Sequence, residues 1–245
     1  MNSASVASPD FALWVYLSRT PLLWLTATLL VYAVADRVSA ATGRHPLTNP
    51  VLHSVWALGL MLALTGTPYR TYFEGAQFVH FMLGPATVAL AIPLWETRRQ
   101  IARALVPMLA ALAAGAVTAL VSAVGIAMAL GAPREALISI APKSVTAGVA
   151  MGISETLGGD PALSAALVIL TGILGALIVT PLMNGLGVTD WRARGFSVGL
   201  ASHGIGAARA FQVNETAGAF AGVAMGLNAL FTALIVPPIL RLMLN

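Results

Sequence analysis

The sequence predicts an all-α integral membrane protein, built as a polytopic bundle of helices, some of them discontinuous. Of its 245 residues, 58% are hydrophobic and only 9% are charged. A soluble domain carries about 25% charged residues, so this chain lacks the polar side chains needed to cover a water-facing surface. The high mean hydropathy of +0.86 excludes a soluble enzyme and a disordered protein. The chain has no cysteine, which excludes a disulfide scaffold and thiolate metal sites.

Six long apolar runs predict membrane-spanning helices, because a span needs about 20 mostly apolar residues. The first run is short, but its flanking Arg19 and Asp36 can extend toward the water. None of the runs alternates as the strands of a membrane barrel would. The runs cover residues 20–35, 44–70, 75–95, 104–133, 161–189 and 216–240.

The whole chain, 1–245, is predicted to form a single membrane domain, because no Ser/Gly-rich linker or block of charge divides it. We expect an interfacial segment at 1–19, whose aromatic residues suit the membrane surface. A first half over 20–130 and a second half over 134–241 follow. The expected location is the inner or plasma membrane of the cell, crossed several times.

Two further apolar stretches, 134–157 and 189–214, are interrupted by charges, glycine or proline. Each is predicted to form two half-helices joined by an irregular turn. Irregular backbone is tolerated at membrane depth only inside protein or beside a water-filled cavity, so we expect function in these stretches. If 134–157 enters and leaves on one side, most loop arginines, with Arg241, share one side and satisfy the positive-inside rule. If it crosses fully, that bias largely disappears.

The sequence also contains the trace of an internal repeat. Asn49-Pro50 and Asp160-Pro161 each open a long apolar run, and similar glycine-containing blocks start at Gly75 and Gly195. One interpretation is chance similarity in a chain rich in glycine and alanine. The other is a pair of inverted repeats, related by a pseudo-two-fold axis in the membrane plane. In transporters, paired broken helices in two such halves mark the binding site.

Lys143 is the only lysine of the chain and follows Pro142 within an apolar stretch. An ionisable residue at membrane depth is costly and indicates function. Pro142 ends a helix, and Ser144 and Thr146 can cap the next one, whose first N–H groups attract anions. We therefore predict that Lys143, Ser144 and Thr146 bind an anionic substrate. The alternative is a lysine that extends to the membrane surface from a short helix end.

Ser202, His203 and Arg209 lie within eight residues of a second apolar stretch, in which two glycines after His203 permit a sharp unwinding. The planar fork of Arg209 can bind a carboxylate through two hydrogen bonds. His203 can bind substrate or carry a proton, because its ordinary pKa is near neutral. The alternatives are a hydrogen-bonded packing histidine and an Arg209–Glu215 pair at a helix end.

Three other candidates have open alternatives. Pro85 and Thr87 interrupt the third run and are predicted substrate contacts, or mark only a proline kink. Asn228 lies in the last run, where its amide needs a partner, so it either lines the site or bridges helices. A series of glycines spaced by four allows close helix packing, within the chain or between copies in a homo-oligomer. These glycines are Gly218, Gly222 and Gly226.

Motifs of soluble enzymes are missing, since the chain has no GxSxG, HExxH or Walker A sequence. We therefore expect no enzyme activity, no cofactor and no metal site. The net charge is +4, but the arginines are scattered rather than clustered, so no nucleic-acid partner is expected.

Five blocks resemble the LrgB/CidB family in consistent order over about residues 20–240. They are LGPATVALAIPLW (83–95), PKSVTAGVAMGIS (142–154), ILTGILGALI (169–178), ASHGIGAARA (201–210) and GAFAGVAMGL (218–227). The plastid glycolate/glycerate transporter carries a similar domain. The resemblance implies a membrane protein that moves small carboxylates such as glycolate, glycerate or pyruvate. It also implies a partner, a small membrane protein of the LrgA/CidA type. Thr146-Ala147-Gly148 stands where the family usually has two threonines and a proline, which leaves the exact substrate open.

Two functions follow. The first is a transporter of small monocarboxylates, with proton coupling as an option, whose site lies at 142–146 and 201–209. The second is the older, holin-like description of the family, a protein that affects murein hydrolase activity, cell lysis or membrane permeability. A holin has no need of a lysine and an arginine at helix breaks, so these residues favour the transporter.

Overall fold

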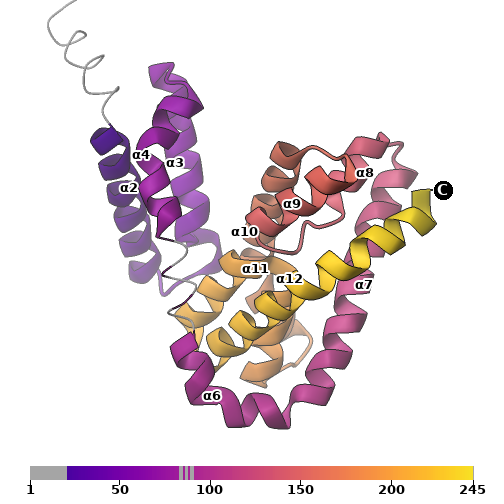
Figure 1. Cartoon of the computed structure of the whole chain (residues 1–245). Coiled ribbons are helices and arrows are strands. Elements are labelled where there is room, and N and C mark those ends of the chain that lie inside the picture. Colours follow the sequence, from indigo (N-terminus) through magenta and orange to yellow (C-terminus); the bar gives the residue numbers. More distant parts are fainter. Residues whose placement is uncertain (1–20, 83–84, 86–87, 89–90, 245) are drawn as a thin grey trace, which may run out of the picture. The chain divides into compact units, whose positions relative to one another are not determined.

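The computed structural model describes residues 21–82, 85, 88 and 91–244, and every regular element in that part of the chain is a helix. This confirms the predicted all-α fold. The chain divides into two compact units, 1–89 and 90–245, and each is described by itself (Figure 1).

The described helices of the first unit are α2 (Pro21–Ala41), the short 3-10 helix η1 (Pro46–Thr48), α3 (Pro50–Thr65) and α4 (Tyr69–Phe81). Those of the second unit are α6 (Ala91–Arg103), α7 (Leu105–Ala129), α8 (Arg134–Ile140), α9 (Ala147–Leu157), α10 (Pro161–Gly185), α11 (Trp191–Val213) and α12 (Glu215–Leu244).

Four of the described helices, α2, α7, α10 and α12, are long and apolar enough to cross a membrane. They confirm four of the six predicted spans and a multi-pass membrane protein. The run 44–70 holds a shorter helix, α3, whose 16 residues extend about 24 Å against a hydrocarbon core of roughly 30 Å. Part of the run 75–95 lies outside the described residues, so its crossing stays a prediction.

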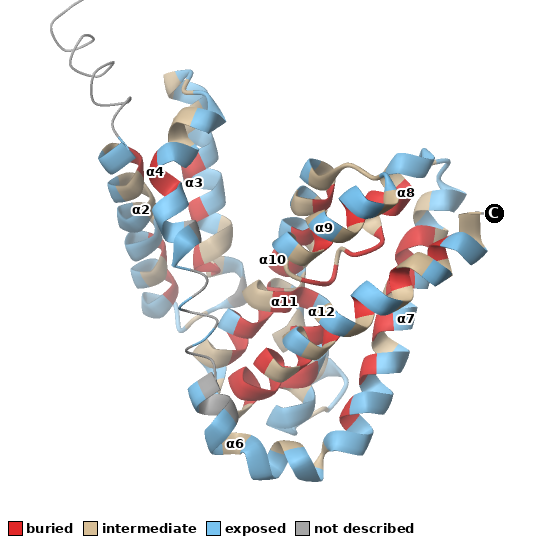
Figure 2. Ribbon diagram, viewed as in Figure 1, coloured by how far each residue is buried: buried red, intermediate tan, exposed pale blue. Residues whose placement is uncertain are grey.

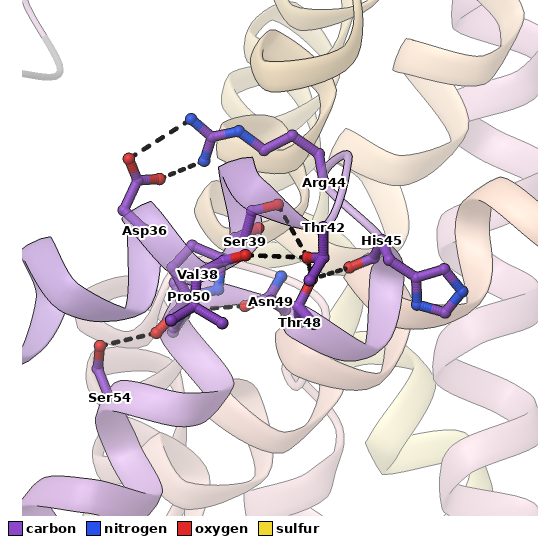
Figure 3. Close-up of polar contacts among 11 residues, drawn as sticks. Asp36, Val38, Ser39, Thr42, Arg44, His45, Thr48, Asn49, Pro50 and Ser54 are labelled. Carbon is purple, nitrogen blue, oxygen red and sulfur yellow. Dashed lines mark hydrogen bonds and ion pairs between the residues drawn. The ribbon is translucent and has the colours of Figure 1, made fainter.

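In the first unit, α2 packs against both α3 and α4. Local polar contacts hold the turn between α2 and α3 (Figure 3). Thr42 Oγ1 donates to the Ser39 carbonyl at 3.0 Å and lies 2.7 Å from Thr48 Oγ1. Arg44, whose φ is 57°, forms an ion pair with Asp36. These contacts fix where α3 begins.

The starts of α3 and α10 are built alike. Oδ1 of Asn49 and Oδ1 of Asp160 each accept the N–H groups two and three residues further on, at 2.8–3.3 Å. In both helices a proline occupies the first position, where no N–H is needed. An internal repeat requires the two helix starts to be alike, and the starts of α3 and α10 are. The inverted repeat itself stays a prediction.

The second unit has two ends, each marked by a cluster of buried side chains. At one end, called the α6 end, the first turns of α7 and α12 pack against α11, and α6 packs against the same cluster. The buried residues of this cluster are Met108, Leu112, Phe196, Leu200, Phe220 and Ala224. The α8 end joins the last turns of α7 and α12 to α8; its cluster is Leu120, Val124, Ile138, Ala141, Val236 and Leu240. Because both α7 and α12 run from one cluster to the other, they cross the unit in the same direction.

Basic residues are unequally divided between these ends. Arg134 and Arg241 lie at the α8 end. The α6 end has the larger group, which consists of Arg98, Arg99, Arg103, Arg192 and Arg194. The expectation that Arg241 shares a side with most loop arginines does not hold for Arg192 and Arg194, because α11 turns back and α12 then runs from their end of the unit to the other. The bias of basic residues between the two ends nevertheless remains.

Buried residues gather where α11 and α12 meet, whereas the outward faces of the long helices are exposed (Figure 2). These outward faces are apolar, as lipid contact requires. Examples are Leu170, Leu174 and Ile178 on α10 and Leu230 and Leu234 on α12.

Candidate functional site

Residues 134–157 form a helical hairpin, called here the first hairpin, with α8 and α9 as its arms and residues 141–146 as its tip. Both of its outer ends meet the last turns of α12. Arg134 donates to the Leu244 carbonyl at 3.2 Å, and Leu157 packs on the cluster that contains Leu240. The segment returns to the α8 end where it began, which supports the re-entrant alternative.

Residues 191–213 form a second hairpin within α11. The helix is interrupted at Ser202 (φ −130°, ψ 15°) and at His203 (φ 42°, ψ −135°). Beyond this break the chain returns along itself, since a Cβ on Gly206 would lie 2.7 Å from the Val198 carbonyl oxygen. The break precedes the two glycines that were expected to unwind the helix. Gly206 instead allows the two arms to approach.

The tips of the two hairpins meet at Asn228, in the middle of α12. The Asn228 amide donates to the Ser144 carbonyl of the first hairpin at 3.2 Å and to the Leu200 carbonyl of the second at 3.0 Å. Thr232 Oγ1 donates to the Asn228 oxygen at 3.2 Å. Asn228 is only 1% exposed. Of the two alternatives for this residue, the structure shows the bridge, and it joins two hairpins rather than two straight helices.

The tip of the second hairpin lies against the middle of α10. His203 Nε2 is 2.9 Å from the Val168 carbonyl oxygen. Because a carbonyl only accepts, this contact assigns the proton to Nε2 and leaves Nδ1 as the basic atom. Glycines on α10 make room for the tip: a Cβ on Gly172 would lie 2.8 Å from the His203 ring, and one on Gly175 would overlap Ser202 Oγ. Ser202 Oγ is buried and has no hydrogen-bond partner among the described residues.

Lys143 lies in the tip of the first hairpin and is partly buried. Its Nζ donates to Ser144 Oγ at 3.3 Å. Thr146 occupies the N-cap position of α9 with extended backbone, but its side chain makes no capping hydrogen bond. The backbone break after Pro142 is therefore where the sequence predicted it, and the expected hydroxyl cap is not formed by Thr146.

Arg209 lines a cavity of about 260 Å³ between the arms of the second hairpin, the end of α10 and the start of α12. It is 6% exposed, whereas Glu215 is exposed and does not line the cavity. The other lining residues are Val179, Thr180, Asn184, Trp191, Arg194, Gly195, Val198, Ala210, Val213 and Ala217.

Lys143 does not line this cavity, and neither do Ser144, Ser202 or His203. The two segments that the sequence assigns to one site, 142–146 and 201–209, therefore do not meet in this cavity, and their joint role in binding stays a prediction. Arg209 comes six residues after the break at His203, so it lies about 9 Å along the returning arm, away from the tips. Of the predicted site residues, Ser144 and Asn228 lie together, because the Asn228 amide donates to the Ser144 carbonyl. His203 lies against α10, where its ring is hydrogen-bonded to the Val168 carbonyl.

The remaining predicted contacts lie in the first unit. Pro85 is exposed, and Thr87 lies outside the described residues.

Sequence reasoning missed Thr180, Asn184 and Arg194 as cavity residues. Arg194 was counted only as a loop charge that sets orientation. The signal available in the sequence was its place one turn after the N-cap Asp190, inside an apolar helix. This position of Arg194 indicates a cavity residue only when it is known that α11 turns back and brings Arg209 beside its own first turn.

The comparisons with known proteins agree with one another. The model of the LrgB-like family matches residues 28–242. The uncharacterized protein YwbG of Bacillus subtilis is 35% identical over 89% of this chain and 97% of that protein. The holin-like protein CidB of Staphylococcus epidermidis is 27% identical over 90% of this chain and 96% of that protein, and CidB of Staphylococcus aureus is 26% identical over the same shares. No solved structure matches the chain. With a family match over most of its length, and with the broken helices at the blocks that carry the resemblance, the chain belongs to the LrgB-like family.

Proposed function

We propose that this protein moves small monocarboxylates, of the glycolate, glycerate or pyruvate type, across the membrane. The observation that carries the proposal is the pair of hairpins that enter the second unit from opposite ends and meet at Asn228. Non-helical backbone in mid-membrane is expensive and is retained beside substrate and ion pathways. A meeting point reached from both sides is the arrangement that alternating access needs.

The side chains at and behind the tips suit an anion. Lys143 supplies a cation at the first tip, with Ser144 and Thr146 beside it in the chain. Ser202 offers a buried hydroxyl at the second tip, and His203 offers Nδ1 as a proton acceptor. Arg209 is buried on the returning arm and supplies a second, forked cation. In the proposed cycle the carboxylate passes between these groups, with a proton on His203 as the coupling option. Pro85 and Thr87 remain predicted contacts.

The test is flux through the purified full-length protein in liposomes. Carboxylate transport predicts saturable uptake of labelled glycolate that unlabelled glycerate or pyruvate inhibits, with no release of trapped sucrose. Protein-free liposomes and liposomes with an unrelated multi-pass protein are the controls. Uptake that does not saturate, or that equals the controls, would refute the proposal.

The second candidate is a holin-like role in membrane permeability, murein hydrolase activity or cell lysis. The observation that favours it is the name of the relatives, since the Staphylococcus proteins at 26–27% identity are called holin-like. It predicts release of unrelated solutes graded by size, with self-association through small-residue faces. The glycolate and sucrose measurements separate the two candidates. Both should be repeated with the LrgA/CidA-type small membrane protein that the family implies, because such a partner could be needed for either activity.

A further inference from the structure

The cavity at the α6 end has a buried floor and an exposed rim. Arg209, Val198 and Ala217 form buried parts of its wall. Asn184 and Trp191, where α10 ends and α11 begins, are exposed. At about 260 Å³ the cavity is smaller than the roughly 300–1,000 Å³ of pockets for drug-sized ligands. Its size and its exposed rim therefore suit a small molecule or head group that enters from the α6 end.

The cavity wall carries two positive charges and no negative one. Arg194 and Arg209 both line it, and none of its described lining residues is acidic. Asp190, the acid one turn before Arg194, is bound by Arg192 at 2.5–3.1 Å. Those hydrogen bonds involve both carboxylate oxygens and lower the pKa of Asp190 to about 2. Glu215 is exposed and outside the lining.

The Arg194 side chain is held by two contacts, and one of its N–H donors is still without an acceptor among the described residues. One of its Nη atoms donates to Asn184 Oδ1, and the guanidinium lies over the Trp191 ring, 5.1 Å from its centroid. Its Nε is buried and has no acceptor among the described residues. A buried N–H without an acceptor is costly, and an oxyanion in the cavity would supply one once the guanidinium turns toward it.

We infer that this cavity is a binding site for a single small oxyanion, held between Arg194 and Arg209 and separate from the hairpin tips. Guanidinium forks match the two oxygens of a carboxylate and those of a phosphate. The oxyanion is therefore either a free carboxylate or the phosphate of an acidic lipid at the membrane surface. Any use of the site as the first stop of a carboxylate on its way to the tips rests on the proposed function; the binding itself does not.

The test is equilibrium binding to the purified full-length protein in neutral detergent, followed by calorimetry, with sodium acetate in one arm and short-chain phosphatidylglycerol in the other. The variants are Arg194→Gln, Arg209→Gln and Arg194→Lys. Arg99→Gln is the matched control, because it removes the same charge at the α6 end from a side chain that is exposed and does not line the cavity. Loss of a charge-assisted hydrogen bond weakens binding by about ten- to a hundredfold.

We expect that loss in both glutamine variants, a smaller loss in Arg194→Lys, and wild-type affinity in Arg99→Gln. Acetate binding that phosphatidylglycerol does not displace identifies a carboxylate site, and binding of phosphatidylglycerol alone identifies a lipid phosphate site. If neither probe binds, or if monodisperse Arg194→Gln and Arg194→Lys bind as the wild type does, the inference is overturned. Binding without glycolate flux would refute the transport proposal and leave the site standing, whereas flux without binding would do the reverse.

Discussion

The two hairpins reach the middle of the second unit by different means. The first turns over six residues, 141–146, which include Pro142, and its tip carries the cation Lys143. The second turns at only two residues, Ser202 and His203, and its cation Arg209 lies well back on the returning arm. The first hairpin therefore places its cation at the tip, whereas the second places its cation on one of its arms.

The packing behind the hairpins differs as well. A Cβ on Gly195 or Gly199 would lie 2.0–2.1 Å from a backbone oxygen of α12, so the second hairpin and α12 touch backbone to backbone. Gly148 and Gly152 on α9 have open space instead, and they line a groove of about 440 Å³ against α12. The second hairpin therefore packs more closely on α12 than α9 of the first hairpin does.

The largest expected effect separates the two cations. Arg209→Lys should lose about ten- to a hundredfold of carboxylate flux, because an ammonium cannot reproduce a bidentate fork. Lys143→Arg should keep more flux than Lys143→Ala, since the tip of the first hairpin needs only a positive charge. The measurement is initial glycolate uptake at equal amounts of inserted protein. Normal kinetics in Arg209→Lys would mean that the second hairpin contributes no substrate contact through this residue.

The second prediction asks whether the sharp turn also carries the proton. A pH difference of one unit can drive about tenfold accumulation per coupled proton. His203→Gln keeps an N–H for the Val168 carbonyl but removes the basic Nδ1. It should abolish accumulation driven by the pH gradient while substrate exchange continues. Unchanged accumulation would restrict His203 to packing or substrate binding.

The third prediction tests the difference in packing. Gly199→Ala places a methyl group against the Ala221 backbone oxygen, so α11 or α12 must shift. Overpacking of this kind costs about 1–3 kcal/mol, which lowers the unfolding midpoint by roughly 3–10 °C. Gly152→Ala meets nothing and improves helix propensity by up to about 1 kcal/mol, so its midpoint should stay or rise. Equal midpoints in detergent for the two variants would contradict the contrast between the hairpins.

Sequence reasoning located the two breaks but gave their geometry only in part. The proline before Lys143 marks the first break directly, because it removes a backbone N–H. At the second break the sequence predicted unwinding at the two glycines after His203. The helix is instead interrupted at His203 itself, and positive φ is uncommon for a residue other than glycine. Gly172 and Gly175, about 30 residues earlier, have no side chain and so leave space for Ser202 and His203. The Val168 carbonyl accepts a hydrogen bond from His203. These contacts between distant segments exist only in the folded chain, so local pattern could not show that α11 turns back or that Arg194 and Arg209 line one cavity.

The smallest expected effect concerns Asn228, whose side-chain amide donates a hydrogen bond to each of the two tips. Hydrogen bonds between membrane helices contribute about 0.6 kcal/mol each on average. Asn228→Ala removes the two to the tips and the one from Thr232, so it should cost about 1–2 kcal/mol and lower the unfolding midpoint by roughly 2–6 °C. Thr232→Val is the matched control, because it removes only the hydroxyl that orients the amide and should cost about a third as much.

The stability change alone would not show that the tips are coupled, so accessibility supplies the second measurement. The chain has no cysteine, and Ser144→Cys or Ser202→Cys therefore gives each tip a single thiol for a maleimide reagent. If Asn228 holds both tips, Asn228→Ala should speed labelling at both positions, and more at Ser144→Cys, because the first hairpin has open space behind it. Faster labelling at one tip only would mean that each hairpin is held by its own contacts and that Asn228 does not join them.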